Sequence, residues 1–385
     1  MIKTQVVKLK VNKTMQKHLD ALCDYRRYCW NKGLETWQLM YEAHTLNKKD
    51  NPSPNERRVR DELVTNKADW QYDLSARCLQ LAIKDLANAW KNFFDKSQPD
   101  WGIPSFKSKK APRQGFKTDR AKIVNGKLRL DRPRSISKAD WFDLKSYEAL
   151  KMNEVKVISI FKEKGAYYAA LTYEEEPISK TKTHQKTAVD VNVGHFNYTD
   201  GKINVLPAKL QKLYKRIKHY QRMLARKREV NGKLATKSNN YFAVRTKLQR
   251  DYRKVANIQN DLLQQFTTKL VDNYDQIVIE DLAVKQMMMT HVASKGMQRS
   301  LFSRFRQILT YKCNWYGKEL ILADKTYPST QRCAACGYVK KGEEKITLQG
   351  NKKHGTKHNE YICYECGYSN DRDENAVLNL LALVK

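Results

Sequence analysis

Residues 361–381 read YICYECGYSNDRDENAVLNLL, and residues 330–339 read TQRCAACGYV. The first stretch contains Cys363-x-x-Cys366 and the second Cys333-x-x-Cys336, with 26 residues between the two pairs. A glycine follows each pair and permits the tight turn that aims two thiolates at one ion. Two such pairs joined by one hairpin predict a closed zinc site of the structural kind, with four thiolate ligands. A redox or disulfide pair is the alternative interpretation, but that chemistry would need only one of the two cysteine pairs.

The segment after the second cysteine pair contains Asp373, at the start of a short apolar helix. An aspartate in this position is usually a helix cap. Two carboxylates further upstream favour a different interpretation. Asp190 lies within an apolar run at 187–193 and Glu280 ends another at 276–280, and both runs are typical of buried strands. A buried carboxylate is costly unless a partner compensates its charge.

A divalent metal would provide that compensation, so the three acidic residues predict a two-magnesium site for phosphodiester hydrolysis at one edge of a sheet. The two Mg²⁺ ions would lie roughly 3.5–4 Å apart. We expect Asp190 to bridge them, with Glu280 and Asp373 each on one ion. The four-cysteine zinc site would do no chemistry, but it would hold the segment that carries Asp373.

The composition points to a nucleic-acid partner. The chain has 385 residues, with 73 Lys and Arg against 41 Asp and Glu, a net charge of +32. Such an excess indicates binding to polyanions that weakens with salt. A membrane protein is excluded because no apolar run approaches the roughly 18 residues that a span requires. Four further cysteines without motif spacing favour a reduced, intracellular protein with buried thiols: Cys23, Cys29, Cys78 and Cys313.

The first half of the chain predicts two kinds of structure. Residues 1–13 and 98–178 form a mostly β unit, with an Asn-Gly hairpin turn at 125–126. Residues 14–97 form a helical unit inserted after the first strand, and its second long helix is predicted to be capped by Ser75. The basic stretch 107–122 is either a nucleic-acid-binding face or a solvated loop, and its charge alone does not decide between them.

A polar linker at 179–186 leads into a second domain, at 187–330 and 369–385, interrupted by the cysteine hairpin at 331–368. Its predicted order of strand, hairpin, two helices, strand, helix, strand and final helix is RNase H-like. The two long helices each have one apolar and one cationic side, which favours a nucleic-acid channel over a coiled coil because acidic partners are few. The segment 282–296 is predicted to be a lid.

Several motifs together resemble those of the TnpB family, the RNA-guided nucleases encoded by insertion sequences and related to the compact type V CRISPR effectors. The resemblance rests on AVDVNVG at 188–194, IVIEDL at 277–282, PSTQRCAACG at 328–337 and CGYSNDRDENAVLNL at 366–380. The upstream GIPSFKSKK at 102–110 is similar to that family's β-wedge segment. The order and the length match as well, so the resemblance covers essentially the whole chain.

The resemblance implies an α+β multidomain protein: a β-barrel wedge domain with an inserted helical recognition domain, then a RuvC α/β domain with an inserted zinc ribbon. It implies that Asp190, Glu280 and Asp373 are the catalytic acids and that the four hairpin cysteines bind zinc. The role of Asp371 stays open. Two features depart from the family pattern: Asn192 stands where a small residue is usual, and the stretch 258–261 lacks a common arginine.

The implied function is cleavage of double-stranded DNA beside a short flanking motif, directed by a guide RNA from the end of the protein's own element. We expect a monomeric ribonucleoprotein in the cytoplasm of a bacterial or archaeal cell, associated with the nucleoid when it is bound to its target. Two alternatives are an RNA-guided DNA-binding regulator that does not cut and a transposase with an RNase H-like acidic site. The candidate nucleic-acid contacts are Phe106, Lys107, Lys109, Lys110, Arg113, Lys215, Arg222, Arg226 and Arg228.

Overall fold

The structure is a computed structural model, and it divides the chain into two compact units, Met1–Glu176 and Pro177–Lys385. It describes residues 2–95, 101–133, 136–139, 141–152, 154–163, 165–176, 178–230, 233–234, 238–282, 301–347, 349–351 and 353–384. The side chains of residues 228–230 and 233–234 are not among those described. The segment 283–300, which contains nearly all of the predicted lid, lies outside the described residues.

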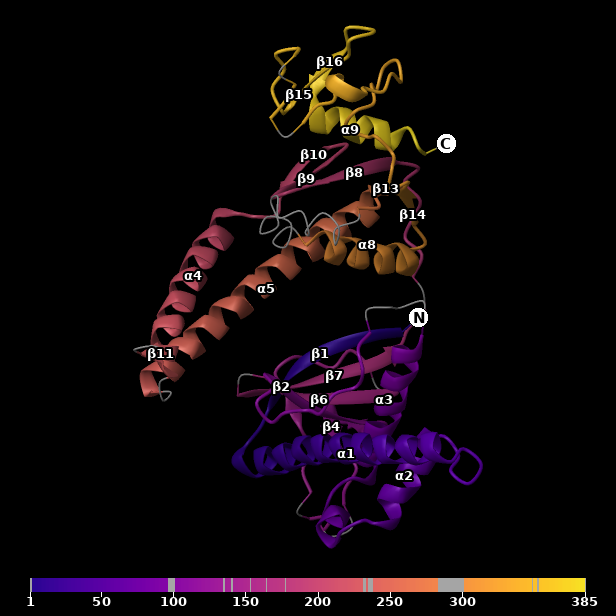
Figure 1. Ribbon diagram of the computed structural model, residues 1–385, viewed down its shortest axis with the longest axis vertical. Coiled ribbons are helices and arrows are strands. Elements are labelled where there is room, and N and C mark those ends of the chain that lie inside the picture. The colour runs from indigo at the N-terminus through magenta and orange to yellow at the C-terminus, as the bar shows by residue number, and fades with distance from the viewer. Residues whose placement is uncertain are drawn as a thin grey trace. The chain divides into compact units, whose positions relative to one another are not determined.

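The first unit contains an antiparallel sheet with the strand order β2-β6-β7-β1-β5 (Figure 1). Its strands are β1 (Ile2–Lys10), β2 (Arg113–Thr118), β5 (Lys145–Ser146), β6 (Val157–Glu163) and β7 (Ala166–Glu174). A separate hairpin joins β3 (Lys122–Val124) to β4 (Lys127–Arg129). Its turn residues Asn125 and Gly126 have φ angles of 50° and 68°, so the predicted Asn-Gly turn is confirmed.

Helices pack against this sheet in one shared core. They are α1 (Lys13–Leu46), α2 (Glu56–Thr65), the 3₁₀ turn η1 (Asp69–Asp73) and α3 (Ala76–Phe94). The side chain of Ser75 accepts a hydrogen bond from the backbone of Arg77, which confirms it as the cap of α3. Leu34 and Ile83 from the helices belong to the same hydrophobic cluster as Ile160 from β6. Most residues between Lys13 and Phe94 are therefore helical, and their buried side chains belong to the same core as those of the β strands.

The second unit is built on a mixed sheet with the strand order β10-β9-β8-β13-β14 (Figure 1). β8, β9 and β10 are antiparallel neighbours, whereas β8, β13 and β14 run parallel. The strands are β8 (Lys186–Asn192), β9 (His195–Tyr198), β10 (Gly201–Asn204), β13 (Gln276–Glu280) and β14 (Glu319–Ala323). The strands predicted at 187–193 and 276–280 therefore form, the first as Lys186–Asn192, and β14 supplies the later strand of the predicted order.

Helices cover both faces of this sheet (Figure 1). One face packs against α5 (Asn239–Asn273) and α8 (Phe302–Tyr316), and the other packs against α9 (Arg372–Leu381). A further helix, α4 (Ala208–Arg228), pairs with α5 along an apolar seam that includes Ile217 and Val255. The short strands β11 (Glu229–Val230) and β12 (Lys233–Leu234) lie between the two helices in the chain.

The cysteine-containing region has little regular structure: η2 (Gly342–Glu344), β15 (Glu360–Ile362) and β16 (Ser369–Asp371). The predicted α+β class is confirmed in its coarse form, sheets combined with helices. None of the helices in the described part of the chain combines the length and apolar character that a bilayer-spanning segment requires. The four cysteines without motif spacing are buried, as predicted: Cys23, Cys29, Cys78 and Cys313.

Candidate active site and metal centre

Alternation along two neighbouring strands determines where Asp190 and Glu280 lie. Ala188 of β8 and Val278 of β13 pack toward α9, whereas the intervening Val189 and Ile279 pack toward α5 and α8. Side chains two residues apart share a face of a sheet, so the two carboxylates lie on the α9 side. The parallel register pairs Ile279 with Val189, and the acidic residues follow directly on the two strands. They are therefore neighbours at one end of the sheet.

Asp190 is almost fully buried, with 2% of its surface exposed. Its Oδ2 accepts a hydrogen bond of 2.6 Å from Nδ2 of Asn192. Burial, followed by repulsion from Glu280 and Asp373, raises the pKa of Asp190 to about 8. A carboxylate held this way is poorly compensated by protein groups and well suited to bind a cation. Asn192, the departure from the family pattern, is a hydrogen-bond donor to the central acid.

Glu280 ends β13, and its Oε1 accepts a hydrogen bond from the hydroxyl of Ser329. Burial raises the pKa of Glu280, and the bond from Ser329 partly opposes that rise. The sequence reasoning did not single out Ser329. Its position in the PSTQRC stretch, directly before the first cysteine pair, is the only signal that could have drawn attention to it.

Asp373 lies in the first turn of α9, and its neighbour Asp371 is the helix cap. The side chain of Asp371 accepts hydrogen bonds from the backbone nitrogens of Asp373, at 2.9 Å, and Glu374, at 3.3 Å. Asp371 therefore caps α9 and satisfies two backbone N–H groups at the start of the helix.

The carboxylate of Asp373 meets the side chains of a histidine and an arginine. Nε2 of His195 lies 3.1 Å from its Oδ2, and Nη2 of Arg372 donates to its Oδ1 at 3.1 Å. Burial opposes ionisation, but the bonds from His195 and Arg372 together hold the pKa of Asp373 below its usual range. His195 was missed from the sequence. The two-residue turn after Asn192 pairs His195 with that residue across the hairpin, so the turn was its available signal.

A cavity of about 560 Å³ opens beside these groups and is lined by Asp190, Glu280, Asn192, Ser329 and Arg372, among others. Among the described residues, the three carboxylates do not converge closely enough to form a metal-binding cluster of the kind that the cysteines form. Glu280 is bonded to Ser329 and Asp373 to His195, which accounts for the separation. The three acids offer carboxylate oxygens, the donor type that Mg²⁺ and Mn²⁺ prefer.

The four hairpin cysteines form a cluster in which all sulfur atoms lie within 4.8 Å of one another. Sγ of Cys333 is 3.7 Å from that of Cys366, and Sγ of Cys336 is 3.6 Å from that of Cys363. A disulfide requires about 2.05 Å, whereas sulfurs about 2.3 Å from a central zinc in a tetrahedron lie roughly 3.8 Å apart. The cluster therefore fits a four-thiolate metal site.

The glycines after each cysteine pair adopt the predicted left-handed backbone. Gly337 has φ 79° and Gly367 has φ 73°. The nitrogen of Gly337 donates to the carbonyl of Cys333, and that of Gly367 donates to the carbonyl of Cys363. The two turns thus have the same hydrogen-bond pattern, which directs each cysteine pair toward a common point.

Several candidate nucleic-acid residues of the first unit instead make internal contacts. Nζ of Lys107 lies 3.5 Å from the centre of the Trp30 ring, and burial lowers the pKa of Lys107 to about 8. The guanidinium of Arg113 lies 3.4 Å from the centre of the Phe161 ring. Lys107 therefore helps to hold the loop at 101–111 on its own unit, whereas Arg113 packs strand β2 against β6.

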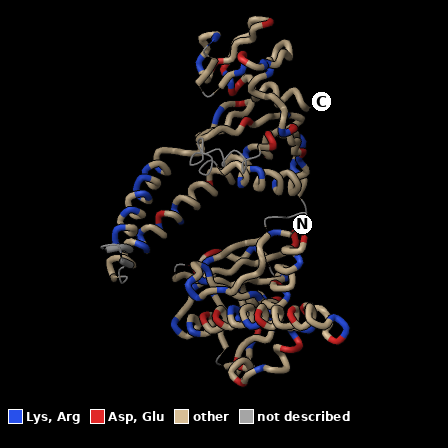
Figure 2. Tube along the Cα trace, in the orientation of Figure 1, with Lys and Arg blue, Asp and Glu red and all other residues tan. Residues whose placement is uncertain are grey.

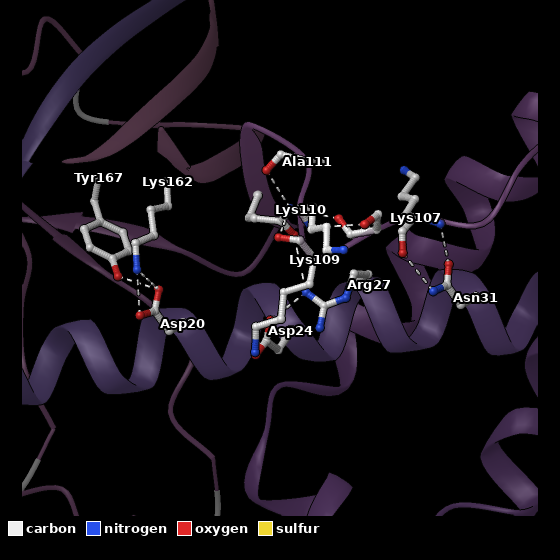
Figure 3. Close-up of polar contacts among 12 residues, drawn as sticks. Asp20, Asp24, Arg27, Asn31, Lys107, Lys109, Lys110, Ala111, Lys162 and Tyr167 are labelled. Carbon is white, nitrogen blue, oxygen red and sulfur yellow. Dashed lines mark hydrogen bonds and ion pairs between the residues drawn. The ribbon is translucent and has the colours of Figure 1, made fainter. Parts of the chain in front are cut away.

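Further polar contacts of this loop appear in Figure 3. Nζ of Lys109 pairs with Asp24 at 3.0 Å, and the backbone of Lys107 exchanges two hydrogen bonds with the side chain of Asn31 (Figure 3). Phe106 and Lys110 remain exposed, Phe106 by 59%. Of the five candidates in this loop and the following strand, these two side chains keep the most freedom to contact a partner.

The helical pair of the second unit carries the densest positive charge (Figure 2). α4 contains nine Lys and Arg and no acidic residue. Its candidates Lys215, Arg222 and Arg226 are exposed, and the side chain of Arg228 lies outside the described residues. A groove between α4 and α5 is lined by four cations: Lys209, Lys212, Arg216 and Lys254.

Comparisons with known proteins agree with this geometry. A family model described as "Probable transposase" matches residues 170–290, and one described as "Cas12f1-like, TNB domain" matches residues 302–380. A "Putative RNA-guided DNA endonuclease" of Streptomyces pristinaespiralis is 26% identical over 80% of this chain and 72% of its own. The InsQ protein of Escherichia coli K12, with the same description, is 28% identical over 81% of this chain and 75% of its own.

A solved structure has the same fold along the whole chain. It is the cryo-EM structure of a Cas12f1–sgRNA–target DNA complex, which aligns with a TM-score of 0.57 over 99% of this chain and 98% of that one, at 11% sequence identity. At that identity the match speaks for the fold alone. The two family models and the curated relatives confirm the resemblance to the TnpB family that the motifs around Asp190, Glu280 and Asp373 indicate.

Proposed function

We propose that this protein is an RNA-guided endonuclease that cuts double-stranded DNA beside a short flanking motif and works within an insertion-sequence element. The observation that carries the proposal is the cluster of acids contributed by β8, β13 and α9, in a chain whose relatives are described as RNA-guided DNA endonucleases. The strand order, with three parallel strands beside an antiparallel hairpin, supports a RuvC domain of the RNase H type at 187–330 and 369–385.

In this proposal Asp190, Glu280 and Asp373 would hold two magnesium ions. When bound, these ions supply Lewis acidity and a hydroxide nucleophile for hydrolysis of the phosphodiester bond. Asp190 contributes a buried charge that prefers a cation to solvent, and Asn192 orients its carboxylate. Ser329 and His195 orient Glu280 and Asp373. No nucleophilic side chain is required.

The remaining segments have supporting roles. The four cysteines would hold one structural zinc ion in a ribbon at 331–368. The unit before residue 177 would combine the wedge and helical recognition functions that read the flanking motif. The cations of α4 and α5 suit the phosphate backbone of a guide–target heteroduplex, in which base pairing selects the sequence. The working particle would be a monomeric ribonucleoprotein.

The proposal is tested with the protein purified together with its RNA at moderate salt. Sequencing of that RNA should return one discrete species, and a plasmid that matches it should be cut only when Mg²⁺ is present. Asp190→Ala should abolish cleavage without weakening target binding. Target binding without cleavage by the wild type would favour the regulator, strand joining without RNA would favour the transposase, and the absence of a discrete RNA would refute guided cleavage.

A further inference from the structure

Two asparagines one turn apart on α9 face the segment that joins β14 to the cysteine cluster. Asn375 is 0% exposed and Asn379 is 2% exposed. Asparagine is an unfavourable choice for the buried side of a helix, because its amide must find partners that an apolar residue would not need. Both side chains find those partners in the backbone of residues 329–334.

The contacts are short and shared. Nδ2 of Asn379 donates to the carbonyl of Ser329 at 2.9 Å and to that of Arg332 at 2.7 Å. Nδ2 of Asn375 donates to the same Arg332 carbonyl at 2.7 Å, and its Oδ1 accepts from the nitrogen of Ala334 at 3.0 Å. The Arg332 carbonyl therefore uses both of its lone pairs on α9.

The segment 329–334 contacts both the acidic site and the cysteine cluster. Ser329 is 3% exposed, and its hydroxyl donates to Glu280. Four residues later, Cys333 opens the cysteine cluster. The hydroxyl of Tyr327 also reaches α9, where it donates to the carbonyl of Asn379 at 2.9 Å. α9 therefore carries Asp373 at its start and, along its buried side, holds the backbone that orients the partner of Glu280.

Ordinary packing of a loop on a helix explains part of this arrangement, because buried backbone groups need partners. It does not account for which groups are bonded. Asn379 bonds to Ser329, the residue whose side chain meets Glu280, and Asn375 bonds on both sides of Cys333. The two asparagines thus connect the acid-binding end and the cysteine end of one short segment.

We propose that Asn379 is a positioning residue for Glu280 that acts through Ser329, and that Asn375 ties the same segment to the cysteine cluster. This inference rests on the proposed function, because it assigns Glu280 to the metal site. The cysteine cluster and the acidic site then share a common support, α9. A displacement of the segment would rotate Ser329 away from Glu280 and lower the affinity of the acidic site for its metal.

Binding of Mn²⁺ to the purified ribonucleoprotein, followed by electron paramagnetic resonance, tests this inference without requiring cleavage. Four variants are compared with the wild type: Ser329→Ala, Asn379→Ala, the double variant, and Leu378→Ala as a control at a position 42% exposed on the same helix. Loss of a group that orients a metal ligand typically weakens metal binding by about 10–100-fold. We expect a loss of about 10-fold in each single variant, and the same loss, without multiplication, in the double variant.

The non-additive double variant distinguishes positioning through Ser329 from a general structural effect, which would multiply the two losses. Zinc content should stay at the wild-type level in Ser329→Ala, which keeps the backbone carbonyl that Asn379 contacts. Wild-type Mn²⁺ affinity in either single variant, or multiplied losses in the double variant, would overturn the inference and leave the proposed function standing. Absence of Mn²⁺ binding that depends on Asp190 would instead overturn the proposed function itself.

Discussion

Replacement of Asp190 by Asn should make the magnesium-free protein more stable, by an amount that increases with pH. In the folded chain burial and the neighbouring acids raise the pKa of Asp190 from 3.8 to about 8. The folded state therefore holds this proton more tightly than the unfolded state does. Below the unfolded pKa both states are protonated and the group has no effect. As the pH rises from the unfolded pKa toward the folded pKa, the unfolded state ionises while the folded state keeps its proton, so the free energy of unfolding falls steadily.

The magnitude follows from about 1.36 kcal/mol for each pH unit above the unfolded pKa. At pH 5 the penalty is about 2 kcal/mol, and at pH 7.5 it is about 5 kcal/mol, again from that conversion. The cost of burying an asparagine amide does not depend on pH, so it cancels when the two conditions are compared. The advantage of Asp190→Asn over the wild type should therefore grow by about 3 kcal/mol between pH 5 and pH 7.5.

Thermal unfolding of both proteins at these two pH values measures the difference. For a unit the size of residues 177–385, about 1 kcal/mol corresponds to roughly 2–4 °C in Tm. The gap between the variant and the wild type should thus widen by roughly 6–12 °C, from the same conversion. The buffer must lack both magnesium and chelators, because a chelator would also remove metal from the cysteine cluster.

A control variant and added Mg²⁺ test whether the buried charge of Asp190 causes the pH dependence. Asp261→Asn removes an exposed carboxylate from α5 and should leave the gap unchanged with pH. Added Mg²⁺ should stabilise the wild type and have no effect on Asp190→Asn, because only the wild type retains the central ligand. A gap that stays constant or narrows from pH 5 to pH 7.5 would refute the view that Asp190 is an uncompensated buried charge.

Three further predictions concern other parts of the chain. Asp371→Ala should lower the free energy of unfolding by about 1 kcal/mol, and it should reduce the cleavage rate because the first turn of α9 loosens. Asp371→Ser should restore both the stability and the cleavage rate. Equal cleavage rates in the two variants would contradict the capping role. Gly115→Ala should destabilise the first unit by about 1–3 kcal/mol in urea unfolding, because the new Cβ would lie 2.6 Å from the backbone oxygen of Ile160. An unfolding midpoint equal to that of the wild type would show that strands β2 and β6 can move apart to admit the new methyl group. Arg216→Ala should destabilise the α4–α5 pair in urea unfolding, because Asp251, which is 3% exposed, would lose its ion-pair partner. Adding Asp251→Leu to that variant should recover much of the lost stability. Without such recovery, the burial of an unpaired charge is excluded as the cause.

Local patterns in the sequence were sufficient for the features set by a few adjacent residues. The cysteine pairs form a cluster because each C-x-x-C-G turn has a geometry dictated by its own backbone, with Gly337 and Gly367 at positive φ. The same holds for the Asn125-Gly126 hairpin and for the cap at Ser75. Apolar runs around Asp190 and Glu280 predicted their strands because few other elements bury so many consecutive apolar residues.

Contacts between segments far apart in the chain were decided only by the tertiary structure. Spacing in the sequence carries no information about which hydroxyl contacts Glu280 or which imidazole contacts Asp373. Packing brought Ser329 to Glu280 across 49 residues of chain, and it brought His195 to Asp373 across 178 residues. Packing also placed Lys107 against Trp30, a contact that the charge of the stretch 107–122 did not indicate. The sequence by itself determined which residue types could bind metal and nucleic acid. The fold determined which partners orient them, because hydrogen bonds between distant segments form only where the packed core brings their atoms within reach.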